Sequence, residues 1–233
     1  MDLFGSPAGV RNVLYLYLAL AFPLIMTFFH HRTLVRKHGG YRGFLLYFAA
    51  FFILFLAIPA LIIIAAAANP WDFFASLGFT FGRTGKSALL TAIAVPVVLL
   101  AAFFATRDPA MKAQYPYSKE ACAGLKKFVV YETCYIGLYY LPWEFLFRGI
   151  LFFPLIPAVG ILPALALQTI ISTIYHFGHP DSEIYAALGG GIIFGLIAYA
   201  TGSLLPTFII HSLAGVATDS FLYTRYHRSG RTA

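Results

Sequence analysis

The sequence predicts an all-α fold, a polytopic transmembrane helix bundle of about seven spans, on three observations. Hydrophobic residues make up 60% of the 233 residues and charged residues only 11%, whereas a soluble domain carries roughly 25% charged residues. The mean hydropathy is +0.79, so lipid must cover much of the surface. Apolar runs near the ~20 residues that a membrane span needs recur along the chain. We therefore expect a single membrane domain, residues 1–233, in a lipid bilayer.

Seven apolar segments are the predicted spans: residues 12–29, 44–68, 87–105, 128–153, 162–175, 184–199 and 203–223. The first is too long for the core of a signal peptide and runs into HHR rather than a small-residue cleavage site, so we expect it to be retained. The fifth and sixth are short, so the number of spans could differ by one. Neighbouring helices can accommodate a proline within a span. Four of the spans contain one: Pro23, Pro59, Pro96 and Pro142.

Basic residues near the span ends predict the orientation, because cytoplasmic loops carry an excess of Lys and Arg. One side holds those that follow the first, third and last spans: Arg32, Arg36, Lys37, Arg42, Arg107, Lys112, Lys119, Lys126, Lys127, Arg225, Arg228 and Arg231. The opposite side holds Arg11, Arg83 and Lys86. We expect an integral, multi-pass protein of a prokaryotic plasma membrane, with its N-terminus outside and its C-terminal tail cytoplasmic.

Charge and cysteine content exclude several function classes. The net charge of +7 comes from short runs between apolar segments, which fits anionic lipid headgroups better than nucleic acid. We expect no nucleic-acid partner. The two cysteines, Cys122 and Cys134, do not make a disulfide framework or a cysteine metal cluster.

Ionisable residues inside membrane spans are costly, and they therefore mark candidate functional sites. In this chain they all occur from the fourth span onward: Glu132, Glu144, Arg148, His176, His179, His211 and Asp219. The first three spans carry almost none. We expect residues 1–125 to form scaffold spans and residues 126–224 to form the functional core.

The spacing of these residues indicates the chemistry. Glu144 and Arg148 lie four residues apart, so on a helix they share one face and can form an ion pair. His211 lies in mid-span, with Asp219 about two turns further along the same face. A glutamate and histidines in a dry cavity suit hydrolysis, in which the carboxylate takes a proton from water and histidine stabilises the oxyanion. The same side chains could instead bind Zn²⁺, relay protons, coordinate a transported ion or only hold the bundle together.

Three motifs resemble those of a known family. The stretch WEFLFRG, a histidine further on and then GSLLPTFIIHSL are similar to the CAAX-protease and bacteriocin-processing family, also called Abi, of intramembrane endopeptidases. That family carries EExxxR, FxxxH and HxxxN on successive spans. By this resemblance Glu144 and Arg148 match the second glutamate and the arginine of the first motif, and His211 matches the histidine of the third.

The resemblance offers two residues for the second motif. His176 is the first choice, although Ser172 replaces the phenylalanine. His179 is the alternative, with Tyr175 four residues before it. One branch of the family resembles this chain in carrying Trp-Glu-Phe together with a stretch like HFGHPDSE. This resemblance implies that Glu183 belongs to the site.

Two positions depart from the family pattern. Trp143 stands where the family has its first glutamate, the residue assigned to activating water, and Gly215 stands where it has asparagine. Either Glu144 takes over as the base, or Asp219 and Glu132 compensate, or the protein no longer cuts.

The resemblance implies an intramembrane endopeptidase that hydrolyses a peptide bond of a membrane-anchored or lipidated protein. In this hypothesis Glu144 is the base, Arg148 fixes it, and His176 and His211 bind water and stabilise the oxyanion. We expect no cofactor and no metal, although zinc is compatible with the residues. The alternatives are an inactive relative that serves as a membrane binding or immunity-type protein and, third, a transporter.

Overall fold

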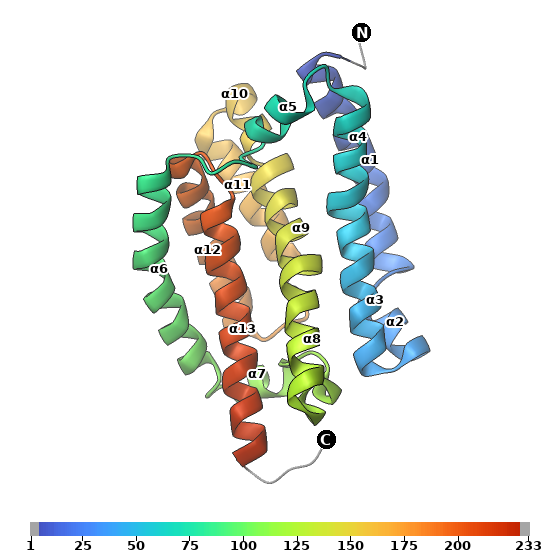
Figure 1. Ribbon diagram of the computed structural model, residues 1–233, viewed down its shortest axis with the longest axis vertical. Coiled ribbons are helices and arrows are strands. Elements are labelled where there is room, and N and C mark those ends of the chain that lie inside the picture. Colours follow the sequence, from blue (N-terminus) through green and yellow to red (C-terminus); the bar gives the residue numbers. More distant parts are fainter. Residues whose placement is uncertain (1–4, 229–233) are drawn as a thin grey trace.

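The computed structural model describes residues 5–228, and Arg231 of the predicted cytoplasmic tail lies outside them. The regular elements of the described part are helices, arranged as a bundle with long parallel and antiparallel members (Figure 1). The start of α1 and the end of α13 lie at opposite ends of this bundle. The prediction of an all-α polytopic bundle is confirmed.

Among residues 5–228, six helical segments are long and apolar enough to cross a membrane. They are α1 (Pro7–Thr27), α3 to α4 (Gly40–Phe52 and Ile58–Ala66), α6 (Thr84–Ala105), α8 to α10 (Leu125–Tyr135, Leu141–Glu144 and Ile156–Val159), α12 (Asp181–Thr201) and α13 (Leu205–Arg228). The shorter helices are α2 (His31–His38), α5 (Pro70–Ser76), α7 (Pro109–Gln114) and α11 (Ile161–Ile174). The described part also contains two 3₁₀ turns, Lys119–Ala123 and Phe153–Leu155.

Of the two spans predicted to be short, the fifth is short in the structure and the sixth is long enough to cross a bilayer. The predicted span 184–199 is part of the 21-residue helix α12, which is long enough to cross. The predicted span 162–175 is the 14-residue helix α11, which is shorter than a bilayer requires. The prediction of about seven spans therefore corresponds to six long helices and one short one.

Prolines in two of the long segments follow π-helical turns. The turns Ile53–Ala57 and Ile136–Tyr140 each end two residues before a proline, Pro59 and Pro142. Proline has no N–H to donate to the preceding helical turn, and a wider turn removes that requirement without ending the helix. A third π turn, Phe145–Ile150, follows directly and carries Arg148.

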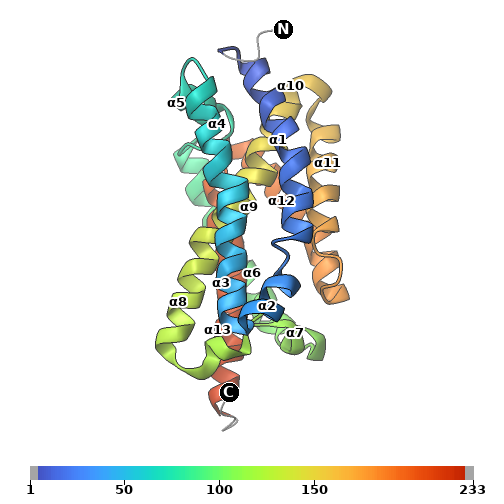
Figure 2. The ribbon, with the colours of Figure 1, turned by 90° about the vertical axis from the view of Figure 1, so that its right-hand side faces the viewer.

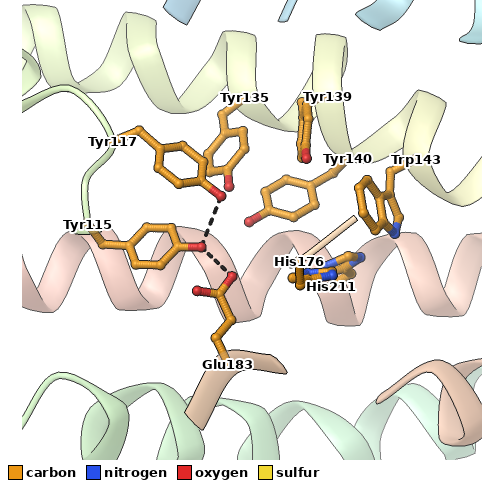
Figure 3. Close-up of a pocket in the computed structure, with 9 residues that line it drawn as sticks. All are labelled: Tyr115, Tyr117, Tyr135, Tyr139, Tyr140, Trp143, His176, Glu183 and His211. Carbon is orange, nitrogen blue, oxygen red and sulfur yellow. Dashed lines mark hydrogen bonds between the residues drawn. The ribbon is translucent and has the colours of Figure 1, made fainter. Parts of the chain in front are cut away.

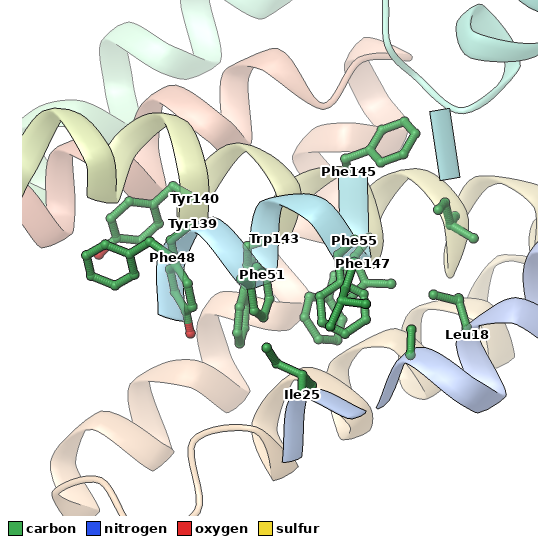
Figure 4. Packing of buried hydrophobic residues seen from close by; sticks show 14 of the residues in the cluster. Leu18, Ile25, Phe48, Phe51, Phe55, Tyr139, Tyr140, Trp143, Phe145 and Phe147 are labelled. Atoms are coloured by element: carbon green, nitrogen blue, oxygen red, sulfur yellow. The ribbon is translucent and has the colours of Figure 1, made fainter. Parts of the chain in front are cut away.

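Aromatic side chains from the α3 and α8 segments make the core beside the site (Figure 4). Phe48 stacks on Tyr135 with ring centroids 4.8 Å apart, and Phe51 lies 4.6 Å from Tyr139. Phe51 also stacks on Trp143 at 6.1 Å. The spacing of three to four residues on each helix puts these rings on one face, so the two helices interlock and fix the direction of Trp143.

Small residues let α11 and α12 approach closely (Figure 2). A Cβ atom on Gly195 would collide with the end of the Leu165 side chain, so any larger residue there would force that side chain to move. The buried Gln168 amide donates to the carbonyl oxygen of Gly191 across the same interface, at 2.8 Å. This packing fixes the end of α11, directly before His176.

Loops at one end of the bundle are tied together. The Leu204 amide donates to the Gly78 carbonyl at 2.9 Å, and the Arg83 amide donates to the Thr201 carbonyl at 2.8 Å. Gly82 has φ +57°, and a side chain there would collide with the Thr201 carbonyl. These bonds set the starting points of α6 and α13, which pack against each other below.

Candidate active site

The predicted ion pair is formed inside the bundle. Glu144 ends α9 and Arg148 lies in the π turn that follows, with Arg148 Nη1 3.3 Å from Glu144 Oε1. The side chains are 0% and 2% exposed, and the guanidinium also lies 5.4 Å from the ring centroid of Phe194. A carboxylate without contact to water is stabilised here by a buried cation.

His211 of α13 brings a second partner to the same carboxylate. Its Nδ1 lies 2.7 Å from Glu144 Oε1. A carboxylate with a cation beside it accepts, so Nδ1 is the protonated nitrogen and the neutral ring has its lone pair on Nε2. The Glu144 carboxylate therefore fixes both the orientation and the tautomer of His211.

His176 has the same tautomer for a different reason. It follows the end of α11, and its Nδ1 lies 2.8 Å from the carbonyl oxygen of Ser172. A carbonyl can only accept, so Nδ1 carries the proton and the neutral ring has an acceptor at Nε2. The indole of Trp143 stands between the two histidines, with ring centroids 5.3 Å from His176 and 6.0 Å from His211.

These rings border a small cavity of about 40 Å³. Figure 3 shows its lining, which comes from the loop before α8, from the α8 to α9 segment, from the end of α11, from the first turn of α12 and from the second turn of α13. The residues are Tyr115, Tyr117, Tyr135, Tyr139, Tyr140, Trp143, His176, Glu183 and His211. The volume suits one or two water molecules, and the lining offers them many polar partners.

Glu183 is the carboxylate that reaches this cavity, whereas Glu144 does not border it. Glu183 lies in the first turn of α12, where its oxygen accepts from His179 Nδ1 at 2.9 Å and from the Tyr115 hydroxyl. Burial raises the pKa of the Tyr115 phenol well above its ordinary value, so this hydroxyl stays protonated and donates. Of the two candidate histidines, His176 therefore faces the cavity and His179 supports Glu183.

The remaining predicted residues lie elsewhere. Glu132 and Asp219 are buried neighbours of each other, on α8 and α13, and neither borders the cavity. The sequence-based prediction of the site considered only acidic, basic and histidine residues, so it did not identify the tyrosines that line the cavity. A signal was present, because Tyr131, Tyr135 and Tyr139 repeat every four residues and so share one helix face.

A much larger apolar chamber of about 720 Å³ adjoins the small cavity. Its walls are the faces of α6, α12 and α13, and many of them are small residues, for example Ala94, Ala101, Ala187, Gly190 and Ala214. Trp143, His176, Glu183 and His211 border both spaces, so the polar cavity lies at one side of the chamber. The site thus joins a few polar groups to a large apolar volume.

The described residues contain no arrangement of side chains that would bind a zinc ion. Among residues 5–228, no three His, Cys, Asp or Glu side chains are arranged to hold a metal ion. The groups on hand are two imidazoles, one carboxylate and several phenols around a water-sized space. Such a set can remove a proton from water and return it to a leaving group.

Comparison with known proteins points to the same part of the chain. Residues 135–217 match the model of a family described as type II CAAX prenyl endopeptidase, Rce1-like. This segment is just over a third of the chain and contains Trp143, Glu144, Arg148, His176 and His211. No curated protein and no solved structure matches the chain.

Proposed function

We propose that this chain, whose residues 135–217 match the type II CAAX prenyl endopeptidase family model, cuts a peptide bond with water activated by the His211–Glu144 pair. The observation that carries this proposal is the 2.7 Å bond that orients His211 beside a water-sized cavity. A histidine whose Nδ1–H is held by a carboxylate is a suitable general base at Nε2.

The reaction begins with water in the small cavity. His211 Nε2 takes a proton from the water as the oxygen attacks the scissile carbonyl carbon, and Glu144 stabilises the imidazolium that forms. The second O–H of the water donates to His176 Nε2, which holds the water in place, and the Glu183 carboxylate borders the same cavity. The imidazolium then returns the proton to the leaving amine.

This assignment gives Glu144 an indirect role. A carboxylate that takes a proton from water must touch the water, yet Glu144 is 0% exposed and its Oε1 accepts from Arg148 and His211. We therefore propose that Glu144 acts through His211, and that Arg148 keeps the carboxylate ionised in a site without water.

The proposed substrate is a membrane-anchored or lipidated protein. The apolar chamber is large enough for a lipid tail or an apolar peptide segment, and Arg148, His176 and His211 are part of its lining. Basic residues gather at the end of the bundle that holds α2 and α7, whereas few lie at the other end. We propose that this basic end is cytoplasmic, in a prokaryotic plasma membrane.

The test is cleavage of membrane-anchored peptides by the full-length protein in liposomes. Glu144→Gln and His211→Gln are each expected to lower kcat/KM by about 10²–10⁴, the usual effect of losing a general base. Glu120→Gln is the matched control, since Glu120 is exposed and only accepts from the Gly40 amide at 3.2 Å.

Two results would contradict the mechanism. If His211→Gln cuts as well as wild type while Glu183→Gln does not, the base is Glu183. If wild type is inactive and only Trp143→Glu cuts, the protein is an inactive relative in which an indole has replaced the missing glutamate.

A further inference from the structure

Few hydrogen-bond donors face the small cavity, although hydrolysis there would create an oxyanion. His176 and His211 have their N–H groups on Ser172 and Glu144, and present acceptors instead. Glu183 is itself an acceptor, and Tyr115 donates to it. Among the described residues that line the cavity, the remaining donors are the indole N–H of Trp143 and the other phenol hydroxyls.

Tyr140 is the phenol best placed for this purpose. Its ring lies 4.7 Å from the ring of His211 in an edge-on arrangement, so it is next to the proposed base. It borders both the small cavity and the apolar chamber, where the peptide would enter. In Figure 3 its hydroxyl points into the space that it shares with Glu183.

Gly215 on α13 makes room for this hydroxyl. A Cβ atom added at Gly215 would collide with the Tyr140 hydroxyl oxygen and lie 2.6 Å from Cζ of the ring. Gly215 is one turn beyond His211 on the same helix face. The phenol from the opposite helix therefore occupies the volume that a side chain on α13 would otherwise fill.

We propose that the Tyr140 hydroxyl donates the hydrogen bond that stabilises the oxyanion, an inference that rests on the proposed function. When water attacks, the carbonyl π electrons move to the oxygen, which accepts from Tyr140 O–H, and the water proton moves to His211. When the C–N bond breaks, the C=O bond re-forms and the amine takes the proton from His211. No other reactant is needed.

Tyr140→Phe removes the hydroxyl and keeps the ring. Losing one such donor typically lowers kcat by about 10²-fold, with KM unchanged. A second readout needs no turnover: binding of a peptide that wild type cuts, with a phosphinate in place of the scissile amide. This tetrahedral anion is expected to bind Tyr140→Phe at least about 10-fold more weakly, while the uncut peptide binds as before.

Tyr131→Phe is the matched control. Tyr131 lies on the same segment, is buried, does not border either cavity, and its hydroxyl has no hydrogen-bond partner among the described residues. It is expected to keep wild-type kcat and phosphinate affinity. Equal melting temperatures of the two variants in detergent would show that the loss in Tyr140→Phe is not one of folding.

The outcomes separate this inference from the proposed function. If His211→Gln is inactive but Tyr140→Phe keeps kcat and phosphinate affinity within twofold, the inference is wrong and the proposed function stands. If substrate and phosphinate affinity fall by the same factor, Tyr140 is a ground-state contact and the inference is also wrong. If wild type cuts no membrane-anchored peptide, both are wrong.

Discussion

Replacing Arg148 with methionine is expected to destabilise the protein strongly, because it leaves a buried carboxylate without its cation. At 3.3 Å, and with an effective dielectric constant of about 20, the attraction between Arg148 and Glu144 is about 5 kcal/mol. Removing one partner of a buried pair costs about 3–5 kcal/mol in other proteins. Glu144 keeps the hydrogen bond from His211, so we expect a loss near the lower limit, about 3 kcal/mol.

The assay is the free energy of unfolding in detergent micelles, followed by far-UV circular dichroism. Arg83→Met is the control, since Arg83 is exposed and bonds only to a backbone carbonyl through its side chain, at 3.1 Å. Its substitution is expected to cost less than about 1 kcal/mol.

The double variant Arg148→Met/Glu144→Gln sharpens the test. It removes the unpaired charge as well, so it should be more stable than Arg148→Met alone. A loss below about 1 kcal/mol in Arg148→Met would refute the argument, and so would a double variant no more stable than the single one.

Two further predictions concern the walls of the site. Ala101→Trp fills the chamber, so KM for membrane-anchored peptides should rise at least about 10-fold. Leu100→Trp is the control and should leave KM unchanged, since Leu100 is 60% exposed and does not line the chamber. Equal KM values for the two variants would show that substrate does not use the chamber. Gly195→Leu overpacks the α11–α12 interface and should lower the free energy of unfolding by about 1–3 kcal/mol. Gly189→Ala is the control and should not destabilise the protein, since a Cβ atom there has nothing within 4 Å. A Gly195→Leu variant as stable as wild type would contradict the packing described.

Membrane class and one contact of the site could be predicted because they depend on local properties. Composition and apolar run length identify helices that need lipid, whatever their arrangement. Glu144 and Arg148 pair because residues four apart share a helix face, and the ion pair is formed as predicted. The span count was less secure, since α11 is apolar like its neighbours and differs mainly in length.

From the sequence alone, His211 and Glu183 could be named as candidate site residues, but their contacts could not be predicted. Glu144 and His211 are 67 positions apart, and Tyr115 and Glu183 are 68 apart, so each pair depends on how helices pack. No periodicity specifies such contacts, because they follow from shape matching between elements that are distant along the chain.

By itself, the sequence determined a membrane-embedded helical protein with a Glu–Arg pair and downstream histidines. Only the tertiary structure decided that Glu144 is sealed behind His211, that Glu183 reaches the cavity, and that a phenol fills the space above Gly215. The physical reason is that a side chain's charge is a property of the residue. Its access to water and its partners are properties of the surfaces packed around it.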